Sequence, residues 1–450
     1  MPEADTLWQA PVPAAVRSTE SFPASADVVV VGGGIAGAST AFWLSRRGIR
    51  TVLCEKGVVG GEQSSRNWGW VRKMGRDPRE LPLMLESERI WRDLDKLVEA
   101  DVGYRRSGVV YLCDSQDELD RRESWLTHAE PFQLDTKVVR GAQLEAVLPG
   151  SGDAWAGALY TESDGRGEPQ LAAPALARAA QDNGASVLTQ CAVRGVETTA
   201  GRISGVVTER GRISCDAVVV AGGAWSSLLC KRQGIRLPQL KVLASVTRVE
   251  PLHEGPEAAA LGPGFAFRRR QDGGYSVANG SANIADIVPD SFRFGLEFLP
   301  VLRIEWRHLK LRFGRRFIDE LRLGRPWSLD EISPFERVRV LNPHPDDSAV
   351  ESALSDLARF FPAFKGAKRS NRWAGLIDAT PDALPVISAV DALDGLFLCT
   401  GFSGHGFGIG PGAGRLMADL VVGEAPLVDP SPFRFERFSD GRRPMPMTGL

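Results

Sequence analysis

The sequence predicts an α/β fold (α+β over the whole chain), with a central parallel sheet in one part and an antiparallel sheet in another. The first observation is the β-branched run DVVVV at residues 27–31, which leads straight into GGGIAGASTAFWLSRRG with the apolar spacing of a helix. A second run, DAVVVAGG at 216–223, is typical of a buried parallel strand. The third, GVVYLC at 108–113, favours an antiparallel sheet.

The first strand, turn and helix carry a GxGxxG motif. Gly32 allows the tight turn, Gly34 lets a pyrophosphate approach the backbone, and Gly37 lets helix and strand pack closely. The free N–H groups at the start of the helix suit phosphates. The next strand, RTVLCEK, ends in Glu55, an acid placed to accept hydrogen bonds from ribose hydroxyls. The pattern predicts a Rossmann-like site for an ADP-containing dinucleotide and leaves FAD and NAD both open.

Composition limits the other classes of protein. The chain has 450 residues, of which 43% are hydrophobic, enough for two or three domains. The 54 Lys and Arg residues nearly balance 56 Asp and Glu residues, so we expect no nucleic acid as partner. The six cysteines and five histidines are scattered, so we expect reduced thiols and no metal site. Residues 1–25 lack the features of a secretory signal, which makes the cytoplasm the expected location.

Several further stretches resemble the D-amino-acid oxidase superfamily of flavoproteins, in particular its glycine oxidase and monomeric sarcosine oxidase branch. The matching pieces are VVVVGGGIAGASTAFWLSRRG, GEQSSRN, ELPLMLESERIW, DAVVVAGGAWSSLL, RWAGLIDATPDALPVI and GLFLCTGFSGHGFGIGPGAGRLMADLV. The resemblance implies FAD as the cofactor. It also implies oxidation of the C–N bond of an amine or amino acid, by hydride transfer to flavin N5, to an imine that hydrolyses. Two alternatives stay open: a dehydrogenase that uses an acceptor other than oxygen, and a non-catalytic FAD-binding subunit.

The resemblance implies an FAD-binding domain interleaved with a substrate domain that holds the antiparallel sheet. Each domain is expected to be discontinuous along the chain. We expect a leader at 1–25, the FAD-binding domain at 26–100, 161–239 and 369–425, the substrate domain at 101–160 and 240–368, and a tail at 426–450.

The resemblance also implies the cofactor contacts. The loop GFSGHGFGIGPGAGR at 401–415 is expected to run beneath the flavin, where glycines permit close approach, with His405 touching the ring or making only a structural hydrogen bond. The expected contacts are Gly32, Gly34, Ile35, Ala36, Gly37, Glu55, Lys56, Ser64, Ser65, Arg66, Asn67, Val193, Ala221, Gly222, Trp225, Gly404, His405, Gly406, Phe407 and Gly408.

Two departures from the relatives concern the flavin. The cysteine that sarcosine oxidase links to its flavin aligns near Gly375, so we expect noncovalent FAD. The lysine that activates oxygen there aligns near Ala278, and the chain has no lysine at that place. Oxygen and another electron acceptor therefore both remain candidates.

Other departures concern the substrate. Arg72 aligns with an arginine that grips the substrate carboxylate, although an ordinary ion pair with a nearby acid is the alternative; Arg72 and His405 are the expected catalytic residues. Trp70, with Trp68, could line an aromatic wall or belong to the core. Asp378 is expected either to hold a cationic ammonium, which favours a distal amine or a polyamine derivative, or to order a turn.

One segment, residues 291–317, interleaves phenylalanine, leucine and tryptophan with arginine and lysine. This pattern predicts a basic amphipathic helix. Such a helix either lies on an anionic membrane surface or covers the substrate domain or another subunit.

Overall fold

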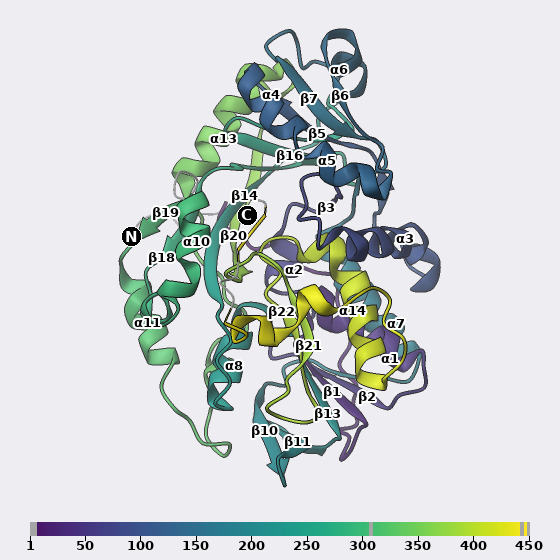
Figure 1. Cartoon of the computed structure of the whole chain (residues 1–450), viewed down its shortest axis with the longest axis vertical. Coiled ribbons are helices and arrows are strands. Elements are labelled where there is room, and N and C mark those ends of the chain that lie inside the picture. The colour runs from purple at the N-terminus through teal and green to yellow at the C-terminus, as the bar shows by residue number, and fades with distance from the viewer. Residues whose placement is uncertain (1–6, 306–308, 442–444, 448–450) are drawn as a thin grey trace.

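Two sheets organise the chain, one in the lower half of Figure 1 and a larger one that extends to its top. The computed structural model describes residues 7–305, 309–441 and 445–447. The first sheet has six strands, of which all but β21 run parallel. Their order is β21 (Val386–Ala389), β22 (Leu396–Thr400), β13 (Ala217–Val220), β1 (Val28–Val31), β2 (Thr51–Cys54) and β9 (Ser186–Leu188).

Both faces of this sheet are covered, which explains why its strands are continuous apolar runs rather than alternating ones. Helices cover one face, seen at the right in Figure 1. They are α1 (Ile35–Ser45), α3 (Leu81–Leu97), α7 (Pro169–Asp182) and α14 (Gly406–Val422). The other face packs on α8 (Ser226–Arg232) and on the three-stranded sheet of β10 (Val193–Thr199), β11 (Arg202–Thr208) and β12 (Gly211–Ser214).

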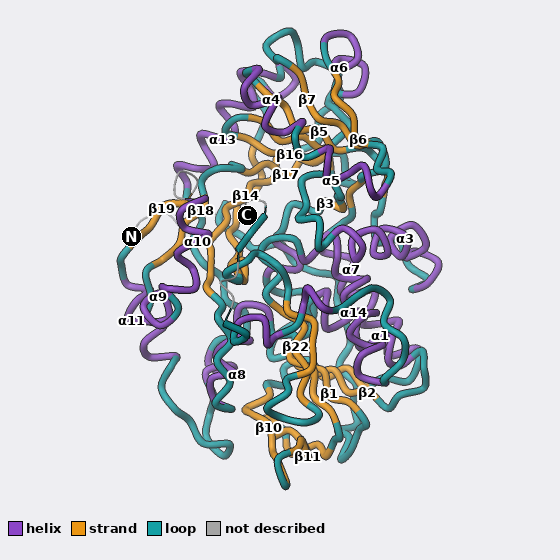
Figure 2. The backbone as a smooth tube through the Cα atoms, viewed as in Figure 1, coloured by secondary structure: helices purple, strands orange, loops and turns teal. Residues whose placement is uncertain are grey.

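The second sheet has ten strands, mostly antiparallel, with parallel pairing between β5 and β15 and between β18 and β19. Figure 2 shows these strands in orange above the first sheet. Along the sheet lie β19 (Leu309–Arg312), β18 (Asn283–Asp286), β14 (Leu240–Val249), β17 (Tyr275–Ala278), β16 (Phe265–Arg269), β15 (Ala259–Gly262), β5 (Val109–Cys113), β7 (Gly157–Thr161) and β6 (Thr136–Val139), and β20 (Arg369–Ala379) pairs with β14.

The mixed α/β class is thus confirmed. The strand β20, expected in the FAD-binding domain, pairs with β14 of the larger sheet over its whole length. The division into domains stays a prediction, because strand pairing assigns segments to sheets and not to domains. The remaining short elements are β3 (Trp70–Val71), β4 (Arg105–Arg106), β8 (Gly165–Arg166), α2 (Gln63–Arg66), α4 (Gln116–Glu123), α5 (Leu126–Ala129), α6 (Gly141–Val147), α12 (Pro334–Arg337), α13 (Asp347–Phe360) and 3₁₀ turns at 130–132, 223–225, 362–364, 431–433 and 435–438.

The segment 291–317 is not one helix, so that expectation is wrong. It contains the end of α9 (Pro289–Arg293), α10 (Gly295–Glu305), β19 and the start of α11 (Arg315–Leu323), and residues 306–308 lie outside the described chain. Gly314 precedes α11, and pairing with β18 holds residues 309–312 extended. Among the helices of the described chain, none is long and apolar enough to span a membrane.

Candidate active site

Two adjoining cavities lie between the sheets. The first follows the carboxyl ends of β1, β2 and β13, the edge at which parallel α/β sheets bind ligands. The second is larger, about 690 Å³, and lies against β5 and β14 of the ten-stranded sheet. Gln63, Asn67, Gly404 and Phe407 line both cavities, so the two spaces meet at these residues.

The first cavity has the features of a dinucleotide site. A Cβ on Gly32 would lie 2.5 Å from the carbonyl oxygen of Ala221, and one on Gly37 would lie 2.0 Å from that of Gly32. The glycines therefore permit the close packing that the motif predicts. Among the described residues, the backbone N–H groups of Gly34 and Ala36 at the start of α1 have no protein acceptor. These orphan donors fit the phosphates of FAD.

Glu55 lines the same cavity from the end of β2. Its carboxylate accepts hydrogen bonds from the backbone N–H groups of Gly33 and Gly57, both at 2.7 Å. Burial raises the pKa of Glu55, while Lys56 and the two backbone donors oppose that shift. An acid held in this place suits ribose hydroxyls, as the sequence predicts.

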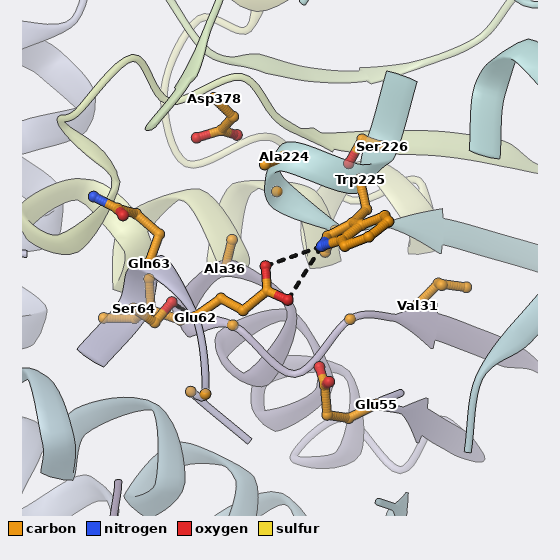
Figure 3. Close-up of a pocket in the computed structure, with 18 of the residues that line it drawn as sticks. Val31, Ala36, Glu55, Glu62, Gln63, Ser64, Ala224, Trp225, Ser226 and Asp378 are labelled. Atoms are coloured by element: carbon orange, nitrogen blue, oxygen red, sulfur yellow. Dashed lines mark hydrogen bonds between the residues drawn. The ribbon is translucent and has the colours of Figure 1, made fainter. Parts of the chain in front are cut away.

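Sequence reasoning missed Glu62, which reaches into the first cavity (Figure 3). Its carboxylate accepts hydrogen bonds from the indole Nε1 of Trp225 at 2.9 Å and from the Nζ of Lys56 at 2.6 Å. Lys56 also lies 4.4 Å from the centre of the Trp225 ring. The position of Glu62 directly before QSSRN was a signal that could have identified it. Arg339 and Phe335 also line this cavity, from a distant segment without any motif.

Most of the predicted cofactor residues meet around the first cavity. They come from the first turn, the end of β2, α2, β10, the turn after β13 and the loop before α14. Those that line it are Gly32, Gly34, Ile35, Ala36, Glu55, Lys56, Ser64, Asn67, Val193, Ala221, Gly222, Trp225, Gly404, Gly406 and Phe407.

Five predicted cofactor residues do not line the first cavity. Gly37 packs beneath the turn, and Ser65 donates a hydrogen bond to the Glu62 carbonyl. Arg66, 2% exposed, donates to the carbonyls of Gly61 and Ala374, so it holds loops together beside the cavity. The other two, His405 and Gly408, line the second cavity, as Arg66 also does.

The thiols nearest the cofactor site are Cys54 and Cys399, both buried in the lining of the first cavity. A contact with Cys191 and burial raise the pKa of Cys54, and burial raises the pKa of Cys399 to about 12. Both therefore stay protonated and unreactive at neutral pH. At Gly375, a Cβ would lie 2.1 Å from the Gln63 side-chain oxygen, so a larger residue there would have to displace that side chain.

The second cavity combines several charged groups, Arg72 among them, with aromatic walls. Arg72 donates a hydrogen bond to the Met74 carbonyl, and its guanidinium carbon lies 5.7 Å from the centre of the Tyr111 ring. No acidic side chain of the described residues pairs with Arg72, so the ion-pair alternative is not realised there. Trp68 and Trp70 meet edge to face with ring centres 5.2 Å apart, and Trp125 lines another part of the cavity.

His405 lies in the second cavity beside a buried ion pair that sequence reasoning also missed. Its Nδ1 is 3.2 Å from the Oε2 of Glu80, and the same oxygen accepts a hydrogen bond from Arg76 at 2.8 Å. Burial alone would raise the pKa of Glu80, but Arg76 and His405 lower it to about 2. Burial lowers the pKa of His405, against the opposing effect of Glu80. The imidazole is therefore neutral at pH 7.

Asp378 lines the first cavity and not the second, so it does not share a cavity with Arg72. Its carboxylate accepts hydrogen bonds from the backbone N–H groups of Gly401 at 2.7 Å and Phe402 at 3.4 Å. These bonds order the turn that begins the 401–408 loop. Burial raises the pKa of Asp378 in spite of them. The geometry favours the turn-ordering alternative over contact with a substrate ammonium.

The fold and the paired cavities are those of a flavin-dependent oxidoreductase. The family model described as FAD dependent oxidoreductase (DAO) matches residues 27–420. The chain belongs to this family, so the predicted family is confirmed. It is an enzyme that oxidises an amine or amino acid with FAD.

Curated relatives and solved structures agree on this class. The glycine oxidase of Pseudomonas aeruginosa is 26% identical over 416 residues, which are 91% of this chain and 98% of the relative. The sarcosine oxidase subunit beta of Rhodobacter capsulatus is also 26% identical, over 92% of this chain and 89% of its own. The structure of the L-amino acid deaminase from Proteus myxofaciens, in complex with anthranilate, is 35% identical with a TM-score of 0.91, covering 97% of this chain and 98% of that one.

Proposed function

We propose that this flavoenzyme is an oxidative deaminase of α-amino acids with large apolar side chains. The observation that carries the proposal is the second cavity, which sets an arginine without an acidic partner among aromatic walls in about 690 Å³. Glycine or sarcosine would fill little of this volume. The 35% identity to an L-amino acid deaminase supports the same reading and favours the L enantiomer.

Arg72 binds the α-carboxylate through the N–H groups that its bond to Met74 leaves free. Trp70, Tyr111 and Trp125 enclose the apolar side chain of the amino acid and exclude water from it. FAD, when bound, supplies the two-electron acceptor for oxidation of the C–N bond. The imine product then adds water and gives a 2-oxo acid and ammonia. The placement of Asp378 gives no support to a polyamine or distal-amine substrate.

Anaerobic reduction of the bound flavin tests this function. We expect L-phenylalanine and L-leucine to bleach the visible flavin band, and glycine, sarcosine, D-phenylalanine and 2-phenylethylamine to bleach it much more slowly. 2-Phenylethylamine lacks the carboxylate that Arg72 binds. Bleaching by sarcosine or glycine alone, or by none of the panel, would contradict the proposal. Admission of air then separates the acceptors: rapid return of the band indicates oxygen, and a persistently bleached flavin indicates another acceptor.

We also propose that the FAD is held noncovalently. The thiols in the first cavity are protonated, and Gly375 offers no thiol. Precipitation of the holoenzyme with acid should therefore release all yellow colour into the supernatant. Colour that stays with the washed pellet would contradict this prediction.

The partner of the segment 291–317 stays a prediction with two alternatives. Phe292, Leu296 and Phe313 are at least 70% exposed, which leaves an apolar surface on α9, α10 and the turn before α11. Its arginines are partly neutralised, since Arg312 pairs with Asp286. Sedimentation of the protein with anionic vesicles, reversed by added salt, would identify a membrane contact. A doubled mass in solution would identify a subunit contact.

The expected cytoplasmic location is tested by cell fractionation.

A further inference from the structure

The buried pair Arg76–Glu80, in the segment just before α3, contacts His405 of the 401–408 loop. Arg76 and Glu80, 1% and 0% exposed, lie just before and at the start of α3, and their N–O distance is 2.8 Å. Burying two charges is costly, and apolar residues of similar size often stabilise a fold as well or better. Stability alone is therefore a weak explanation for the pair.

The guanidinium of Arg76 has a separate partner for each of its nitrogens. Nε donates to the Arg72 carbonyl at 2.8 Å, one terminal nitrogen donates to Glu80, and the other to the His405 carbonyl at 3.4 Å. One rigid fork thus fixes the backbone of the carboxylate-binding arginine relative to that of the histidine. A Cβ on Gly408 would lie 2.9 Å from this guanidinium and would push it out of its present position.

Glu80 acts on the ring of His405. The Oε2 atom of Glu80 lies 3.2 Å from Nδ1 without making a hydrogen bond, and its negative charge favours the tautomer that carries its proton on Nδ1. The Nε2 atom then holds the free lone pair. In the described chain no protein group hydrogen-bonds Nε2, and the residue lines the second cavity.

We propose that Arg76 and Glu80 are positioning residues, which set Arg72 and the Nε2 of neutral His405 as a matched pair for the carboxylate and the amine of one amino acid. The amine N–H donates to Nε2 while the carboxylate accepts from Arg72. The inference rests on the proposed function, because it takes the second cavity as the substrate cavity. Arg76 lines the second cavity, but each nitrogen of its guanidinium already has a protein partner, and Glu80 lines neither cavity. In this scheme both residues act through Arg72 and His405.

The double variant R76M/E80M separates positioning from stability, since it removes both buried charges together and leaves neither unpaired. We expect it to keep its flavin content and melting temperature but to lose about 100-fold in kcat/KM, the effect of misplaced groups. The control R194M/E336M removes another ion pair, with an N–O distance of 2.9 Å, whose members line neither cavity. It should keep wild-type kcat/KM. Wild-type kcat/KM in folded R76M/E80M would overturn the proposal.

A readout without turnover comes from ¹⁵N NMR of the histidine rings, with the His405 signals assigned through H405N. Wild-type protein should show His405 protonated on Nδ1 alone, and R76M/E80M should show both tautomers. An unchanged tautomer in the variant would overturn the role of Glu80. If no amino acid bleaches the wild-type flavin, the proposed function fails while the tautomer result still reports on the ion pair.

E80Q provides the test should the double variant not fold, because its amide oxygen can still accept a hydrogen bond from Arg76. The charged groups that act most on the His405 ring are Glu80, which raises its pKa, and Arg76 and Arg72, which lower it. Activity requires neutral His405 and falls as pH drops through its pKa. Loss of the Glu80 charge should therefore move the acidic limb of kcat/KM to lower pH. If the acidic limb of the E80Q profile stays at the wild-type pH, the proposal is overturned.

Discussion

Replacing Arg72 with methionine should lower kcat/KM for L-phenylalanine by about 10- to 150-fold. A hydrogen bond to a charged group contributes about 1.5–3 kcal/mol, and each 1.36 kcal/mol changes the rate constant tenfold. The loss should fall mainly on KM, because the carboxylate is bound equally in the ground and transition states. Steady-state kinetics measure both constants.

The matched control is a substrate rather than a second variant. 2-Phenylethylamine has the same ring and amine as L-phenylalanine but no carboxylate, so its slow oxidation should be unchanged by R72M. R72K should recover part of the lost activity, since it keeps the charge but not the planar fork. An equal loss for both substrates would mean that Arg72 maintains the shape of the cavity and does not bind the carboxylate.

Replacing Gly37 with alanine should abolish FAD binding. The added Cβ would lie 2.0 Å from the carbonyl oxygen of Gly32, a backbone atom that can move only if the whole turn moves. Overpacking of this kind costs about 1–3 kcal/mol, and here the displaced atoms are those that approach the pyrophosphate. The flavin-to-protein absorbance ratio of the purified variant should fall at least tenfold, and thermal unfolding should begin at a lower temperature.

G295A is the control for this prediction. A Cβ on Gly295 would meet no atom within 4 Å, so the same chemical change should leave flavin content and melting temperature unchanged. A G37A protein with a full complement of FAD would show that the turn can open by more than 1 Å without losing the cofactor, and would remove the reason given for that glycine.

The first turn and the parallel strands could be predicted because their determinants are local. Residues 27–37 combine a β-branched strand with glycines at fixed spacing, and the structure places them at the centre of the six-stranded sheet. The contacts between site residues that lie far apart in the sequence could not be predicted in this way. The contact between Glu80 and His405 joins residues that are over 300 positions apart, and no spacing in the sequence encodes it.

Alignment to relatives also located Asp378 without showing where its side chain would point. Its neighbour Ile377 lines the second cavity, while Asp378 itself lines the first, because successive residues of a strand face opposite sides.

The segment 291–317 has the apolar spacing of a helix. Residues 309–312 nevertheless pair with β18 at the edge of the sheet, so tertiary pairing outweighed the local helix propensity.

The arrangement of the six-stranded sheet also has a consequence for biosynthesis. Its centre, β1, pairs with β13, which in turn pairs with β22, and the loop that closes both cavities follows β22 in the last tenth of the chain. At a synthesis rate of roughly 5–20 residues per second, the loop is synthesised tens of seconds after the glycine-rich turn at 32–37. Flavin can therefore be captured stably only after the loop at 401–408 has been synthesised, and nascent chains that stall before it would carry an incomplete cofactor site.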